Sequence, residues 1–68
     1  MDLAVKNMSE KLVELRGNRT QAAVSKDLGV AVSTLSMYES GERVPRDPIK
    51  VRIANYYGCK VQDIFFTA

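Results

Sequence analysis

The chain has 68 residues, which leaves room for a single domain, and a chain this short buries only about 60% of its unfolded surface on folding. Apolar residues make up 46% of the sequence and charged residues 26%, proportions that exclude a disordered tail and a fibrous repeat. There is no histidine and one cysteine, Cys59, so one chain cannot build an internal disulfide, a typical metal site or a thiol–imidazole pair. We therefore expect a domain that is not an enzyme and carries no metal or cofactor.

The net charge of +2 is unevenly distributed. Between Arg16 and Lys60, eight basic residues stand against four acidic ones, whereas the two ends are slightly acidic. This excess is compatible with a nucleic-acid partner and equally with a solvated basic surface. No apolar run approaches the roughly 20 residues that span a bilayer, and the charged N-terminal segment is unlike a signal peptide. Together with the lone cysteine, these features favour a cytoplasmic protein with no membrane partner.

The first predicted element is a helix that begins near Met8. Its apolar stripe has the helical spacing i, i+4, i+7 and consists of Met8, Leu12 and Leu15. Asn7 and Glu10 have the spacing of a capping box, and Gly17 follows the last periodic position. The pattern leaves residues 1–6 open as either a helical extension or an arm.

Two further short helices are predicted between Thr20 and Glu39. Thr20 is suited to cap the first of them, and Gly29 ends it after about two turns by tolerating a positive φ. The next helix runs from Val32 to Glu39, and Ser25 is small enough for the two helices to cross closely. The side chains expected to face their common core are Val24, Leu28, Val30, Leu35 and Tyr38.

The remaining sequence predicts a loop over 41–47 and two more helices. Asp47 is suited to cap the fourth helix, with Pro48 at its first position, where a missing N–H needs no partner. Gly58 ends that helix, and residues 61–66 form a last short helix over the core. No strand alternation, repeat or linker occurs, so we expect one compact all-α domain of five helices over residues 1–68.

Three segments together resemble the phage repressor and Cro-type (XRE-like) helix-turn-helix family. They are TQAAVSKDLGV at 20–30, LSMYESGERVP at 35–45 and IANYYGCKVQDIF at 53–65. The resemblance implies a DNA-binding regulator of transcription, encoded by a bacterium, phage or mobile element, that represses by binding a palindromic operator as a homodimer. Ala31 departs from the family pattern, which often has a capping hydroxyl at that place. The turn between Arg16 and Thr20 is also shorter than usual in the family.

The resemblance places the base-facing residues on the third helix. Carried over position by position, they are Val32, Ser33 and Met37, with Thr34 and Ser36 beside them. These side chains include none of the cationic or amide groups that pair bidentately with guanine or adenine. We therefore expect readout through thymine methyls, single hydroxyl hydrogen bonds, bridging water and DNA shape. The alternative is that Val32 and Met37 pack inward.

Affinity is then expected to come from phosphate contacts. Gln21 opens the second helix, where its side chain and the free backbone N–H groups can hold a phosphate oxygen. Arg43 and Arg46 lie in the loop after the third helix and can grip the DNA backbone, unless they are merely solvated. Arg19 and Lys50 are weaker candidates of the same kind.

Two expectations concern architecture and assembly. The resemblance implies that Arg16 and Glu39 form an internal ion pair. Phe65 and Phe66 are adjacent, so both cannot face one core, and we expect the C-terminal helices to form the dimer interface with one of these rings contributing. An alternative function is a protein-interaction module on the same fold that has lost DNA binding; the weakly polar third helix favours it, whereas Gln21 and the loop arginines argue against it. No small-molecule ligand is expected.

Overall fold

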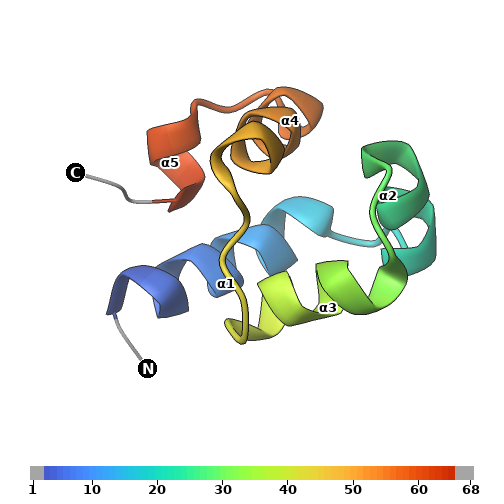
Figure 1. The fold of residues 1–68 in the computed structure, drawn as a ribbon, viewed down its shortest axis with the longest axis horizontal. Helices are drawn as coiled ribbons and strands as arrows, with labels where there is room; N and C mark the ends of the chain where they lie inside the picture. Colours follow the sequence, from blue (N-terminus) through green and yellow to red (C-terminus); the bar gives the residue numbers. More distant parts are fainter. Residues whose placement is uncertain (1–2, 66–68) are drawn as a thin grey trace.

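The computed structural model describes residues 3–65 and contains five helices in that range and no strand (Figure 1). The helices are α1 (Leu3–Arg16), α2 (Gln21–Leu28), α3 (Val32–Ser40), α4 (Asp47–Tyr57) and α5 (Val61–Phe65). The predicted all-α architecture is therefore confirmed. None of these helices is both long enough and apolar enough to cross a membrane.

Helix α1 begins earlier than the sequence pattern predicted. It is continuous from Leu3, so residues 3–6 are a helical extension rather than an arm. Asn7 and Glu10 lie inside the helix, and the predicted capping box is wrong. No glycine or proline interrupts the segment, and half-buried Val5 packs against the core, which stabilises the added turn.

Helix α2 begins and ends as predicted, and a short turn leads from it to α3. Thr20 Oγ1 accepts a hydrogen bond from the Ala23 N–H at 3.0 Å, which confirms its role as the cap of α2. Gly29 has a φ of 74°, a left-handed conformation that glycine adopts without strain. Ala31 starts α3 without any side-chain cap. The first turn of α3 therefore keeps unpaired N–H groups that a side chain often satisfies.

Helix α4 begins one residue before the predicted position. Arg46 is the residue that precedes the helix, and its side chain makes no capping hydrogen bond. Asp47 and Pro48 both lie in the first turn, so the prediction that Asp47 is the cap is wrong. An acidic side chain is also favourable inside the first turn, where it meets the positive end of the helix dipole.

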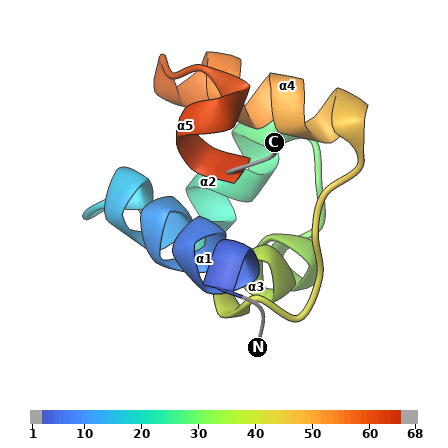
Figure 2. The same cartoon turned by 90° about the vertical axis from the view of Figure 1, so that its left-hand side faces the viewer.

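The core lies between two layers of helices. α1 and α3 lie on one side, α4 and α5 lie on the other, and α2 closes one end between them (Figures 1 and 2). The buried apolar side chains are Met8, Leu12, Val24, Leu28, Leu35, Tyr38, Ile53, Ala54, Ile64 and Phe65. The predicted core residues of α2 and α3 are all among them, whereas Leu15 and Val30 pack against this core while half-buried. This scaffold holds α2 and α3 in a fixed crossing.

Candidate nucleic-acid interface

One face of α3 points away from the core. Leu35, Tyr38 and Glu39 are buried, whereas Ser33 and Ser36 on the opposite side are exposed. At the start of the helix Val32 is 45% exposed, so it does not pack inward. The outward face also includes half-buried Met37 and Thr34 and exposed Ser40.

The chemistry of this face is apolar and hydroxylic. α3 contains no basic residue, and its single acidic residue, Glu39, is buried. Among residues 3–65, no hydrogen-bond partner exists for the hydroxyls of Ser33, Thr34 and Ser36. The face can therefore offer methyl groups and hydroxyls to a ligand, but no charge.

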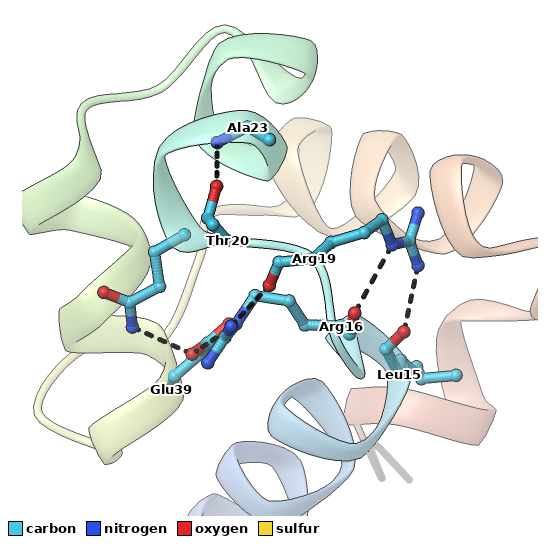
Figure 3. Close-up of polar contacts among 7 residues, drawn as sticks. Leu15, Arg16, Arg19, Thr20, Ala23 and Glu39 are labelled. Carbon is cyan, nitrogen blue, oxygen red and sulfur yellow. Dashed lines mark hydrogen bonds and ion pairs between the residues drawn. The ribbon is translucent and has the colours of Figure 1, made fainter.

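Glu39 is the centre of a buried polar network. The Arg16 Nε–H donates to both carboxylate oxygens, at 2.8 and 3.1 Å (Figure 3). Gln21 Nε2 donates to Oε1 at 2.9 Å. The Glu39 side chain is only 4% exposed and that of Arg16 20%. Arg16 Nη1 also donates to the backbone oxygen of Arg19 at 2.6 Å. The network joins the end of α1, the start of α2 and the last turn of α3, which fixes the orientation of the helix pair.

Gln21 has a different environment from the one expected of a phosphate contact. One N–H of its amide is donated to Glu39, so the side chain is held toward the interior. The start of α2 still presents free backbone N–H groups, because the cap from Thr20 reaches only the Ala23 N–H.

Arg19 and Lys50 are also engaged within the chain. Arg19 donates to the carbonyl oxygens of Leu15 and Arg16 at 3.0 and 3.3 Å, which closes the end of α1 (Figure 3). Its guanidinium lies 5.3 Å from the ring centroid of Tyr56. The Lys50 side chain is 13% exposed, with Nζ 3.6 Å from an oxygen of Asp47. Neither side chain extends freely from the surface.

Arg43 and Arg46 differ from these two residues. Both are exposed, and neither guanidinium has a partner among residues 3–65. The loop that carries them is anchored to α3, since the backbone N–H groups of Glu42 and Arg43 donate to the Met37 carbonyl at 3.0 and 3.3 Å. Two cationic groups without a partner among residues 3–65 therefore lie in the loop between α3 and α4, Arg43 next to α3 and Arg46 directly before α4.

Sequence reasoning missed a second set of contacts, made by α4. Arg52 Nη1 donates to the Leu28 carbonyl at 3.0 Å, and the Tyr56 hydroxyl donates to the Asp27 carboxylate at 2.8 Å. The hydrogen bond to Asp27 raises the pKa of Tyr56 above its ordinary value. Arg52 and Tyr56 are four residues apart, so they share a face of α4 and together hold the end of α2. Their spacing was visible in the sequence, but a carbonyl acceptor has no sequence signature.

Of the two adjacent phenylalanines, only Phe65 lies within the described residues. Phe65 is 4% exposed and belongs to the core, so it has almost no surface to offer to a second chain. The expectation for Phe66 lies outside the described residues.

Two comparisons with known proteins agree with this geometry. Residues 10–64 match the helix-turn-helix family. An uncharacterized HTH-type transcriptional regulator of Methanocaldococcus jannaschii is 37% identical over 60 residues, which cover 85% of this chain and 91% of the relative. This relative is archaeal, so similar proteins are not confined to bacteria and phages. No solved structure matches the chain.

Proposed function

The chain belongs to the helix-turn-helix family and is a non-enzymatic, DNA-binding transcriptional regulator; we propose that it represses transcription from a palindromic operator, which it binds as a homodimer. The observation that carries this proposal is the exposed, uncharged face of α3 together with two arginines in the loop that follows it, which have no partner among residues 3–65. The face supplies contacts to bases, and the arginines supply contacts to the DNA backbone.

Helix α3 has the size required for the major groove. Its 9 residues correspond to a length of about 13 Å, and the groove is about 12 Å wide. The N-terminal half of the helix enters the groove and meets base edges. The residues that make these contacts are Val32, Ser33, Thr34, Ser36 and Met37.

Arg43 and Arg46 grip the phosphates on one side of the groove. The start of α2, with Gln21 and its neighbouring N–H groups, holds a phosphate on the other side. With about three phosphates per protomer, a dimer has a slope of log K against log salt of about −5. Arg19 and Lys50 add little, because their side chains are committed to contacts within the chain.

Assembly into a dimer follows from the small footprint of one α3. A single helix reads too few base pairs to compete with nonspecific genomic sites, whereas two copies read half-sites about 34 Å apart. Since Phe65 is buried, an interface at the C-terminal end rests on the exposed surface of α5 and on the residues after it. The mass of the protein in solution, with and without operator, tests this assembly. A strict monomer on a single half-site would contradict it.

The test of DNA binding is a gel-shift titration with random duplex at two salt concentrations, followed by selection of bound sequences from a random pool. We expect a steep salt dependence and selected sites with two-fold symmetry. A slope near zero would contradict the proposal and favour the alternative, an interaction module without DNA binding. The uncharged α3 face is the observation that favours this alternative.

A further inference from the structure

We infer that α3 recognises the 5-methyl group of pyrimidines without distinguishing thymine from 5-methylcytosine, so that cytosine-methylated duplex is among its ligands. This inference rests on the proposed function, and it specifies the chemical group of the DNA that the exposed face of α3 recognises. It follows from which groups the exposed part of α3 presents and which it lacks.

The apolar groups of this face lie where a helix first meets the bases. Ala31 directly precedes the helix and Val32 is its first residue; both are exposed, and Met37 follows on the outward side. Val32 presents two methyl groups at 45% exposure, with no side-chain cap beside it. In the major groove, the apolar group on a base edge is the pyrimidine 5-methyl, which thymine and 5-methylcytosine share. Contact between these groups removes apolar surface from water on both molecules.

The polar groups of the face do not identify the pyrimidine that carries the methyl. Thymine presents an acceptor, O4, whereas cytosine presents a donor, the N4 amino group. A serine or threonine hydroxyl can accept or donate. The hydroxyls of Ser33, Thr34 and Ser36, which have no partner in the described range, therefore satisfy either base equally well. The methyl group thus decides the affinity at such a position.

The partner purine is not identified by α3 either. Adenine is read by a bidentate Asn or Gln and guanine by a bidentate Arg or Lys, and α3 contains none of these residues. Its one carboxylate, on Glu39, is bonded to Arg16 and Gln21 and faces the interior. The free arginines follow the other end of α3, about 13 Å along the helix from Val32. The first turn therefore contacts its base pair without a discriminating polar group.

The experiment uses operators selected from the random pool. Each thymine is replaced in turn by uracil, symmetrically in both half-sites, and affinity is measured at one salt concentration. At the position most sensitive to this change, the pair is then replaced by 5-methylcytosine·guanine and by cytosine·guanine. We expect uracil to weaken binding about threefold to fivefold per half-site, the effect of one lost methyl contact. We expect 5-methylcytosine to bind within about twofold of thymine and cytosine to bind like uracil.

A pair of valine variants assigns the effect to α3. Val32→Ala is expected to bring the ratio of thymine to uracil affinity close to one. Val51→Ala is the matched control, because Val51 is 48% exposed on α4, and it should leave the ratio unchanged. Val32→Gln adds an amide that pairs with adenine, so it should create a preference for thymine·adenine over 5-methylcytosine·guanine that the unchanged protein lacks.

The outcomes separate this inference from the function on which it rests. Equal affinity for thymine and uracil at every position, or for 5-methylcytosine and cytosine, in duplexes that are still bound selectively would overturn the methyl inference alone. Loss of the preference in Val51→Ala to the same extent as in Val32→Ala would also overturn it. Absence of selective binding to any duplex would overturn the proposed function as well.

Discussion

The arginines of this small domain divide into two groups with different roles. Arg16, Arg19 and Arg52 lie at the junctions of α1, α2 and α4, and each donates to an acceptor within the chain. Figure 3 shows the contacts of Arg16 and Arg19. Arg43 and Arg46 lie in the loop after α3 and have no partner in the described part of the chain. The basic excess in the middle of the sequence is therefore only partly available to a polyanion.

The difference has a simple physical origin. A domain made of short helices has many helix ends, and each C-terminal end leaves carbonyl oxygens unpaired. Arg19 and Arg52 satisfy such carbonyls at the ends of α1 and α2. The loop between α3 and α4 carries its two arginines away from these ends. A junction arginine thus stabilises the fold, and a loop arginine remains free for the ligand.

The largest effect is expected from the centre of the junction network. Glu39→Ala leaves the Arg16 Nε–H and the Gln21 amide without their carboxylate acceptor, and should lower the free energy of unfolding by about 3 kcal/mol. The melting temperature should fall by more than about 10 °C in a domain of this size. Circular dichroism on heating measures this change. Glu39→Gln retains the shape of the side chain and should lose less, and an unchanged melting temperature for the alanine variant would contradict the role of the network.

Substitution of the loop arginines should weaken DNA binding and leave stability unchanged. Arg43→Ala and Arg46→Ala should each weaken DNA binding about tenfold, because each removes a charge-assisted contact to phosphate. Each should also make the salt slope less negative by about one per protomer. The melting temperature should stay close to that of the unchanged protein. Undiminished DNA affinity in the double variant would break the distinction between the two groups of arginines.

Arg52 provides the matched control from the group of arginines that donate to acceptors within the chain. Arg52→Ala removes the donor to the Leu28 carbonyl and should cost about 1 kcal/mol of stability. The salt slope of DNA binding should not change, because this guanidinium does not reach the phosphates. A slope reduced as much as in the loop variants would place Arg52 in the DNA interface instead.

The smallest effect is expected on the pH dependence of stability and concerns Tyr57, the last residue of α4. Burial raises the pKa of its hydroxyl above 10.0, and the hydroxyl has no hydrogen-bond partner in the described part of the chain. Because the pKa of Tyr57 is higher in the folded than in the unfolded protein, the stability contributed by the neutral hydroxyl is fully present below the unfolded pKa. This contribution is lost as the pH rises through the pKa of the folded protein. Between about pH 9 and about pH 11, the melting temperature should fall more steeply than in Tyr57→Phe. Parallel curves for the two proteins would contradict this assignment.

Local patterns predicted most of the helical architecture. The glycine at position 29, the cap at Thr20 and the apolar spacing from Val24 to Tyr38 each act within a few residues of the chain, so the sequence indicated them correctly. The start of α1 was mistaken because Asn7 and Glu10 have capping spacing but lie within a longer helix. Packing of Val5 against the core overrode that local signal.

The sequence by itself determined that the chain forms a helix-turn-helix domain, because helix periodicity and turn residues are local properties. The tertiary structure alone decided which polar side chains remain free. Gln21 and Lys50 each find a partner and Phe65 joins the core, whereas Arg43 and Arg46 have no partner among the residues that the structure describes. These outcomes depend on carboxylates, carbonyls and apolar surfaces that packing brings from distant segments, and no spacing of residues along the chain records that proximity.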